Sequence, residues 1–363
     1  MSLTTQQIWV DKHDLNATKV IQDTLTDDVL GEDDVLLRIE QFGFSANNIT
    51  YASMGEHMGY WGFFPAGSGY GIIPVWGFAV VERSMHPDIA EGERIFGYLP
   101  MASHWVIRAG KVAKHGFKDI HPNRKSISPV YDQYLRCSAD PAYNLDREVW
   151  QQAFRPLFMT SFVLDEFVYR SATQSVLLVS SASSKTATGC ACLMRHQREK
   201  RESKFRIIGL TSEANRDMVC DSNCYDEVMT YSEANSLSET DSYWLLDFAA
   251  NGEMLTKLKR QLGNALERIT LIGATDWQSK AKPDRAGLNA DVFFAPAHVK
   301  HMQQEWGHEG FLSRYADAWK LFSENTTQTY YEQQHEGVNN VLAVYKETLA
   351  GLMNPNALLS LKF

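Results

Sequence analysis

The chain has 363 residues, a length that predicts two domains of ordinary size rather than one. Apolar residues make up 44% and charged residues 22% of the chain, which excludes extensive disorder. The formal net charge of −9 gives no general attraction for nucleic acid, and no stretch approaches the ~18 consecutive apolar residues that span a bilayer. The start lacks the pattern of a secretory signal, and the five cysteines fit reduced thiols. We therefore expect a cytoplasmic protein without a nucleic-acid or membrane partner.

The first ~110 residues predict short strands and turns. Strands are expected at 34–41, 75–82 and 94–98, and the segment 55–77 is rich in glycine and aromatic residues. Such a segment is typical of tight turns near a cleft, although surface loops explain it nearly as well. Residues 110–150 are interrupted by prolines, and the spacing of apolar residues predicts a helix over 146–170.

After residue 170 the pattern changes to alternating strands and helices. Strands are predicted at 175–179, 206–210, 227–231, 243–248 and 268–273, with helices at 186–199, 213–220 and 252–263. Short apolar strands at this spacing indicate βαβ units and a parallel, doubly wound sheet. The basic run 195–206 is interpreted as a solvated helix end. Helices at 311–322 and 338–353 and a short apolar end at 358–363 complete the chain.

Several degenerate motifs follow one another in an informative order. The first half carries GFSANNIT at 43–50 and EGERIFGY at 91–98. The second half carries SASSKTA at 181–187, GLTSEANR at 209–216, DEVMTYSE at 226–233, YWLLDFAANGE at 243–253 and RITLIGATDW at 268–277. In this order they resemble the medium-chain dehydrogenase/reductase superfamily, in particular its zinc-independent quinone oxidoreductase-like branch.

The resemblance implies an α/β fold with two domains. A GroES-like irregular β domain would comprise residues 1–145, completed by 325–363, and a Rossmann-like NADP-binding domain would comprise 146–324. It also implies a homodimer. In the family's first motif, Gly43 and Asn47 match and Thr50 replaces an acid. The family's asparagine lies close to the nicotinamide, so Asn47 is a candidate catalytic residue, and a turn-capping asparagine is the structural alternative.

The loop at 181–187 is the candidate pyrophosphate site. Ser184 and Ala187 stand where the family has glycines, and a helix N-terminus with Lys185 would favour an anion. The alternative is a serine-rich loop that only caps a helix. Lys185 and Thr186 also resemble the end of a P-loop, with Leu245–Asp247 as its second strand, but that motif needs glycine at 179 and 184.

Two hydroxyls and a cation follow the second predicted strand of this domain. Thr211, Ser212 and Arg216 resemble the arrangement of NADP-preferring relatives, so NADP(H) is predicted over NAD(H). The full set of expected cofactor-binding residues is Thr160, Ser181, Ser183, Ser184, Lys185, Thr186, Thr211, Ser212, Arg216, Tyr231, Phe248, Ala249, Gly273 and Ala274.

No cysteine precedes Cys137, and the remaining Cys and His spacings do not match a zinc site, so no metal is predicted. Without a Lewis acid, hydride transfer to a quinone, an enone or a similar small molecule is easier to support than alcohol oxidation. Tyr51 and Tyr131 are candidate donors to a carbonyl oxygen. The rival hypothesis is a non-catalytic or repurposed member of the same fold, whose cofactor site has degenerated.

Overall fold

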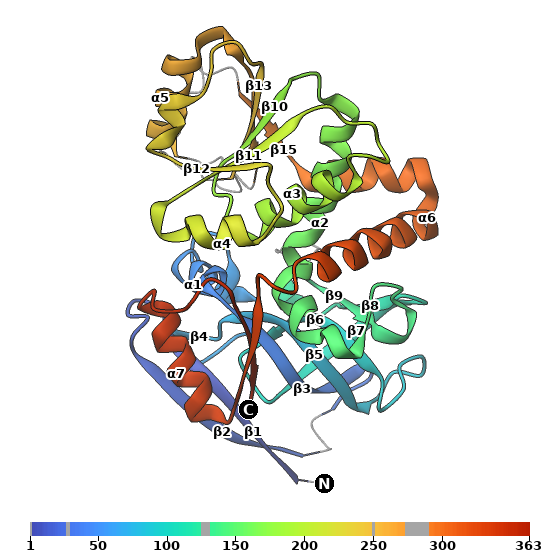
Figure 1. Cartoon of the computed structure of the whole chain (residues 1–363). Helices are drawn as coiled ribbons and strands as arrows, with labels where there is room; N and C mark the ends of the chain where they lie inside the picture. Colours follow the sequence, from blue (N-terminus) through green and yellow to red (C-terminus); the bar gives the residue numbers. More distant parts are fainter. Residues whose placement is uncertain (1, 27–29, 125–130, 249–250, 273–289) are drawn as a thin grey trace. The chain divides into compact units, whose positions relative to one another are not determined.

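The chain folds into two compact units in a computed structural model that describes residues 2–26, 30–124, 131–248, 251–272 and 290–363 (Figure 1). Unit 1 comprises Met1–Pro156 and Tyr331–Phe363, and unit 2 comprises Leu157–Tyr330. The first unit is an antiparallel β-barrel and the second a six-stranded parallel sheet with helices. The predicted α/β fold class is therefore confirmed.

Unit 1 is built on a closed barrel. Its strands follow the order β3-β5-β6-β9-β8-β7, and β7 pairs with β3, so the sheet closes. The strands are β3 (Asp34–Phe44), β5 (Pro74–Ser84), β6 (Arg94–Pro100), β7 (His104–Ala113), β8 (Gly116–Asp119) and β9 (Gln133–Arg136). A separate sheet contains β1 (Ser2–Asp11), β2 (Thr18–Thr26) and β4 (Tyr70–Gly71).

The C-terminal segment returns to this barrel. Strand β17 (Ala357–Lys362) pairs antiparallel with β3, with Leu359 opposite Phe44, and β16 (Tyr331–Glu336) pairs parallel with β17. The helices of this unit are α1 (Ala46–Ser53) and α7 (Val338–Leu349), with the first part of α2 (Glu148–Ser171). The C-terminal segment thus contributes two strands and one helix to unit 1.

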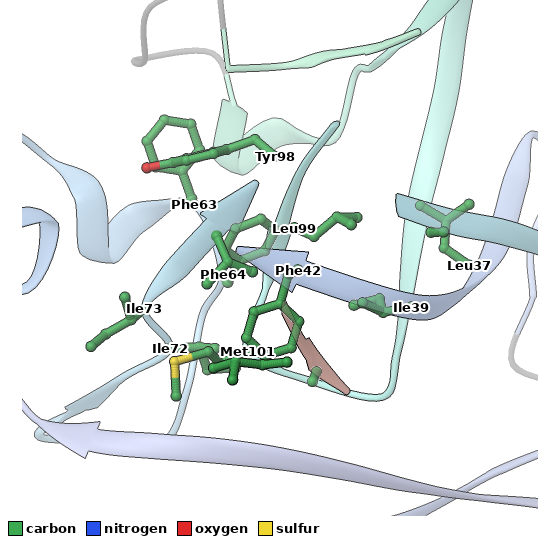
Figure 2. Packing of buried hydrophobic residues seen from close by; sticks show 14 of the residues in the cluster. Leu37, Ile39, Phe42, Phe63, Phe64, Ile72, Ile73, Tyr98, Leu99 and Met101 are labelled. Atoms are coloured by element: carbon green, nitrogen blue, oxygen red, sulfur yellow. The ribbon is translucent and has the colours of Figure 1, made fainter. Parts of the chain in front are cut away.

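The barrel core is apolar and rich in aromatic rings. Figure 2 shows side chains that converge from β3, β6 and the segments around them: Leu37, Ile39, Phe42, Phe63, Phe64, Ile72, Ile73, Tyr98, Leu99 and Met101. Phe42 and Phe64 are 0% exposed. Full burial of each such side chain contributes about 1.5–3 kcal/mol.

Unit 2 has the strand order β12-β11-β10-β13-β14-β15, with every pair parallel. The strands are β10 (Val176–Val179), β11 (Arg206–Thr211), β12 (Glu227–Thr230), β13 (Tyr243–Asp247), β14 (Leu266–Ile272) and β15 (Ala290–Phe293). The order reverses between β10 and β13, and ligands of doubly wound sheets bind at the carboxyl ends of the strands there.

Helices cover this sheet. They are α3 (Lys185–Gln197), α4 (Arg216–Asp221), α5 (Gly252–Leu262) and α6 (Ala295–Asn325), with the second part of α2. Leu255 and Leu258 of α5 pack in one cluster with Leu178 and Leu210 of the strands. None of the helices in the described ranges is long and apolar enough to cross a membrane.

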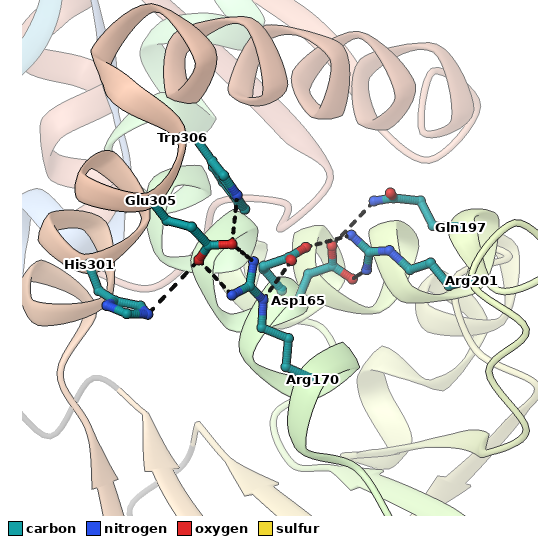
Figure 3. Close-up of polar contacts among 8 residues, drawn as sticks. Asp165, Arg170, Gln197, Arg201, His301, Glu305 and Trp306 are labelled. Carbon is teal, nitrogen blue, oxygen red and sulfur yellow. Dashed lines mark hydrogen bonds and ion pairs between the residues drawn. The ribbon is translucent and has the colours of Figure 1, made fainter.

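The basic run 195–206 was interpreted as a solvated helix end, and most of it fits that interpretation: α3 ends at Gln197, and the exposed residues are His196, Glu199, Lys200, Glu202, Lys204 and Arg206. Two of its arginines form ion pairs. Arg201 donates to Asp165 of α2 at 2.9 Å, and Asp165 is 0% exposed; Figure 3 shows this contact. Arg198 pairs with Asp226 at 2.5 Å. The ion pairs of the half-buried Arg198 and Arg201 were not predicted, because their acids come from distant segments of the chain.

Candidate functional site

The carboxyl ends of the two central strands of unit 2 are joined by a buried serine–aspartate contact. Ser180 follows β10, and its Oγ donates to Asp247 Oδ1 at 2.5 Å at the end of β13. The backbone N–H of Phe248 in turn donates to Ser180 Oγ at 2.8 Å. Ser180 is 0% and Asp247 1% exposed. This contact fixes the start of the loop that leads to α3, and it gives Asp247 a structural role here.

The loop after Ser180 turns through a left-handed serine. Ser181 has a φ of 47°, a conformation that usually favours glycine, and its N–H donates to Tyr231 Oη at 2.9 Å. The N–H of Ala182 donates to the carbonyl of Leu210, and that of Ser184 to the carbonyl of Ser181. Three loop amides are therefore already bonded within the protein.

Ser184 caps helix α3. Its Oγ accepts from the N–H of Ala187 at 3.3 Å, which satisfies one of the donors at the helix start. Burial lowers the pKa of the adjacent Lys185, and Thr186 follows in the first turn. The capping alternative considered for this loop therefore describes Ser184, while the dipole of α3 still favours an anion near Lys185.

The first glycine after the loop serves helix packing. A Cβ at Gly189 would lie 2.7 Å from Ser161 Oγ, which donates to the carbonyl of Thr186 at 2.8 Å. Gly189 therefore lets α3 approach α2, where Thr160 precedes Ser161. Glycine is required in this helix and not in the loop.

The end of β11 holds the residues predicted to select NADP(H). Thr211 is 1% exposed, and its Oγ1 has no hydrogen-bond partner among the residues that the structure describes. Ser212 is exposed, and Arg216 binds Glu233 at 2.8 Å. This hydrogen bond raises the pKa of Arg216. The predicted phosphate-binding cation is therefore already paired with a carboxylate.

Glu233 was missed by sequence reasoning. Its N–H donates to Thr230 Oγ1 at 3.3 Å, and its Oε2 accepts from the Thr230 N–H at 2.8 Å, a reciprocal pair of capping-box type. The spacing Thr–x–x–Glu at 230–233 is the signal that would have found it. Asn215 was also missed; its Nδ2 donates to Ser183 Oγ at 3.1 Å.

A small pocket lies between β11, the end of β12 and α5. It is lined by Leu210, Tyr231, Ala234, Met254, Lys257, Leu258 and Gln261. The Nε2 of Gln261 donates to the carbonyl of Ala234, while its buried Oε1 has no partner within the described part of the chain. The pocket is thus small and mostly apolar, with Tyr231 at one side.

Unit 1 places the three candidate catalytic residues in one aromatic cluster or at its border. Asn47 Nδ2 donates to Tyr51 Oη at 2.9 Å. Helix α1 is capped by Ser45 and Asn48, so the turn-capping alternative for Asn47 does not describe its side chain. Tyr131 reaches the cluster through Tyr60, whose hydroxyl lies 3.5 Å from that of Tyr131.

We define the tyrosine cluster as Tyr51, Tyr60, Phe63, Trp76, Tyr98 and Tyr131. Its ring centroids lie 4.7 Å apart for Tyr51 and Tyr60, 4.7 Å for Tyr98 and Tyr131, and 4.9 Å for Trp76 and Tyr98. Burial raises the pKa of Tyr51, Tyr98 and Tyr131, so these hydroxyls stay protonated at neutral pH. The cluster therefore presents neutral donors, and Tyr60 and Tyr98 were not among the predicted site residues.

Some predicted residues remain without a structural description. Ala249, Gly273 and Ala274 lie outside the described residues, while Phe248 directly follows β13. Within the described ranges, no group of three or more His, Cys, Asp or Glu side chains is arranged to hold a metal ion.

Comparison with known proteins identifies the fold. A family model described as "Protein of unknown function (DUF2855)" matches residues 42–354, and the comparison with curated proteins found no match. The chain is similar to the mitochondrial 2-enoyl thioester reductase Etr1p/Etr2p heterodimer of Candida tropicalis, at 12% identity and a TM-score of 0.57, over 96% of this chain and 97% of that chain. A structure of Etr1p with NADP and crotonyl-CoA matches at 11% identity and a TM-score of 0.59, over 99% and 100%. CurA of Vibrio vulnificus in complex with NADPH matches at 14% and 0.57, over 98% of both chains. The predicted resemblance to the medium-chain dehydrogenase/reductase superfamily is thereby confirmed for the fold.

Proposed function

The chain belongs to the protein family of unknown function DUF2855, and we propose that it is an NADPH-dependent oxidoreductase that reduces a quinone, an enone or a similar carbonyl-conjugated small molecule. The observation that carries the proposal is the carboxyl edge of the parallel sheet in unit 2. There the start of α3 with Lys185, the hydroxyls of Thr211 and Ser212, and Arg216 follow neighbouring strands. Solved structures with this fold hold NADP or NADPH, which supports the choice of cofactor.

The residues present fit a phosphorylated dinucleotide. The start of α3, with Lys185, would hold the pyrophosphate, because a helix N-terminus and a cation both favour an anion. The partnerless hydroxyl of Thr211, with Ser212 and Arg216, would hold the 2′-phosphate. When bound, NADPH supplies the hydride.

The substrate would bind to unit 1 through Tyr51. Asn47 donates to one lone pair of the Tyr51 hydroxyl, which leaves the hydroxyl proton to be donated to a carbonyl oxygen. Burial keeps the hydroxyl protonated, because it raises the pKa of Tyr51, so Tyr51 polarises the carbonyl as a neutral donor. We propose that the activity needs no metal ion, and that the protein works as a homodimer on a small-molecule substrate in the cytoplasm.

A titration of the pure protein with NADPH and with NADH tests this function. We expect NADPH to quench tryptophan fluorescence at lower concentrations than NADH, and a screen of quinones and enones to yield NADPH oxidation. The control is Ser238→Ala, which removes an exposed hydroxyl of unit 2 that is bonded to the hydroxyl and the N–H of Thr240. Absence of NADPH binding at millimolar concentration would overturn the proposal.

One observation favours a second candidate, a binding protein without catalysis. The loop amides of Ser181, Ala182 and Ser184 are bonded internally, and Arg216 is paired with Glu233. A dinucleotide would have to replace some of these contacts. Failure of both cofactors to bind, with the folded state intact, would select this second candidate.

A further inference from the structure

A short segment after β12 contacts two donors of the candidate cofactor site. The Nη1 group of Arg216 donates to Glu233 Oε1 at 2.8 Å, and the N–H of Ser181 donates to Tyr231 Oη at 2.9 Å. Arg216 and the loop at 181–187 are the groups that would hold the phosphates of the proposed cofactor. Residues 230–233 therefore supply oxygen atoms at two positions where phosphate oxygens would bind.

Glu233 lies at the edge of the sheet where the 2′-phosphate would bind. β12 runs parallel to β11, with Thr230 opposite Thr211, and the Tyr231 N–H donates to the carbonyl of Thr211 at 3.0 Å. The side chains of Arg216 and Glu233 are 39% and 41% exposed, so a solute reaches both of them from solvent. The ion pair is therefore an accessible part of the sheet edge and not an enclosed core contact.

The carboxylate of Glu233 is held in place by the backbone. Its Oε2 accepts from the Thr230 N–H at 2.8 Å and from Thr230 Oγ1 at 3.2 Å. The hydrogen bond from the Thr230 backbone, with that from Arg216, lowers the pKa of Glu233 below its ordinary 4.5, so the group is an anion at neutral pH. Most exposed ion pairs join two flexible side chains and contribute little to stability. Here one partner is already fixed, so Arg216 meets a negative charge of defined position.

This carboxylate affects a phosphorylated ribose far more than an unphosphorylated one. A phosphate monoester such as the 2′-phosphate carries about −1.5 to −2 charges at pH 7. To bind Arg216, it has to displace Glu233 Oε1 and to approach a fixed carboxylate of the same sign. A ribose 2′-hydroxyl is uncharged and meets no such repulsion. The carboxylate therefore opposes NADPH without opposing NADH.

We propose that Glu233 is a specificity-determining residue of the cofactor site: it competes with the 2′-phosphate of NADPH for Arg216 and thereby narrows the preference of the protein for NADPH over NADH. The inference rests on the proposed function, because it concerns the cofactor of that reaction. The structural alternative is a carboxylate that only caps the turn at 230–233 and joins it to α4. A glutamine at this position separates the two, because its side-chain oxygen still accepts from the Thr230 N–H but carries no charge.

Binding of the adenosine halves of the two cofactors to the whole chain tests the competition. Adenosine 2′,5′-bisphosphate carries the 2′-phosphate of NADPH, and adenosine 5′-monophosphate is its counterpart from NADH. Isothermal titration calorimetry measures each dissociation constant without a substrate or a hydride transfer. We expect Glu233→Gln to bind the bisphosphate roughly threefold to tenfold more tightly than the wild type, because an exposed ion pair no longer has to be broken, and to bind the monophosphate within about twofold.

The matched control is Glu227→Gln. Glu227 is an exposed carboxylate at the amino end of β12, 3.8 Å from Arg206, so this variant changes the net charge of the protein by the same amount. A double variant, Arg216→Ala with Glu233→Gln, should lose the gain, because the cation for which carboxylate and phosphate compete is absent. Circular dichroism verifies that each variant is folded. Equal bisphosphate affinity in the wild type and Glu233→Gln would overturn the inference, as would an equal gain in Glu227→Gln or a gain that persists without Arg216.

The outcomes for the competition and for the proposed function are separate. Tighter bisphosphate binding by Glu233→Gln, in a protein that oxidises no NADPH with quinones or enones, would support the competition and refute the reductase. NADPH oxidation with the same KM for NADPH in the wild type and Glu233→Gln would support the reductase and refute the competition. If neither protein binds the bisphosphate at millimolar concentration, the competition is refuted, whatever the result with NADPH.

Discussion

Replacement of Asp165 by asparagine should remove a pH dependence of stability from unit 2. Asp165 is 0% exposed and binds Arg201 at 2.9 Å and Gln197 at 3.2 Å (Figure 3). Burial raises the pKa of this carboxyl from its ordinary 3.8 to about 7, and Arg201 only partly opposes that shift. The folded state therefore holds a proton over a pH range in which the unfolded chain has lost it.

The sign and size of the pH-dependent change in the free energy of unfolding follow from proton linkage. Stability from the protonated form is fully present below the unfolded pKa and is lost as the pH rises through the folded pKa. For values of 3.8 and about 7, the free energy of unfolding falls by about 2–3 kcal/mol between roughly pH 5 and pH 8. The amide of the Asp165→Asn variant cannot titrate, so this part of the slope should vanish in that protein.

Urea unfolding of both proteins across this pH range measures the effect. The control is Glu166→Gln, which removes the neighbouring carboxylate bonded to Arg170 and Arg201 but retains the buried Asp165. Its slope should persist and be somewhat smaller than that of the wild type, because the Glu166 carboxylate helps to raise the pKa of Asp165. If Asp165→Asn and the wild type lose stability equally between the two ends of the range, the reasoning from burial is refuted.

Three further changes test other parts of the structure. Arg216→Ala should weaken NADPH binding by roughly tenfold or more and NADH binding much less, in a fluorescence titration; equal losses would contradict the 2′-phosphate assignment. Gly189→Ala should cost about 1–3 kcal/mol in urea unfolding, because the new Cβ would lie 2.7 Å from Ser161 Oγ. Adding Ser161→Ala should restore part of this loss, and no restoration would indicate a different cause. Phe42→Ala should destabilise unit 1 by about 3–5 kcal/mol, since its side chain is 0% exposed in the barrel core; a loss below about 1 kcal/mol would contradict that packing.

The parallel sheet could be predicted because its strands are short and apolar. β11 was expected at 206–210 and runs Arg206–Thr211, with every residue after Arg206 buried. A continuous apolar run between turn residues indicates a strand covered on both faces, and the alternation with helices fixes parallel pairing. The handedness of βαβ units restricts the possible strand orders, and the order itself is seen in the structure.

Strands without such a pattern could not be predicted. β16 reads YEQQHE, and its residues are exposed or half-buried. It is a strand because β17 provides a paired edge, with Tyr331 opposite Ala357. Backbone pairing of this kind leaves no periodic signal in side chains, so it is visible only after the C-terminal segment has been placed on β3.

The residues of the candidate site also differ in whether the sequence could place them. The loop, the end of β11 and Arg216 follow predicted strands, so the sequence could place them at one sheet edge. Tyr98 and Trp76 are aromatic residues in strands, where such residues are common. Only the pairing of β5 with β6 sets them opposite each other, so their closeness in the folded unit could not be predicted from the sequence.

The loop at 181–187 contains no glycine, and the structure explains how the chain turns there without one. Glycine usually permits a left-handed turn and a close approach to the next strand. Here Ser181 takes the left-handed conformation, with its N–H bonded to Tyr231, and Gly209 on β11 gives Ala182 its room, since a Cβ there would lie 3.0 Å from that of Ala182. The loop can therefore lie close to β11 because Gly209, on the strand, has no side chain. A dinucleotide at this loop would therefore compete with the Tyr231 hydroxyl for the Ser181 amide, and Tyr231→Phe should strengthen NADPH binding if the loop holds pyrophosphate. Weaker binding in that variant would instead make the Tyr231 hydroxyl a direct contact of the cofactor.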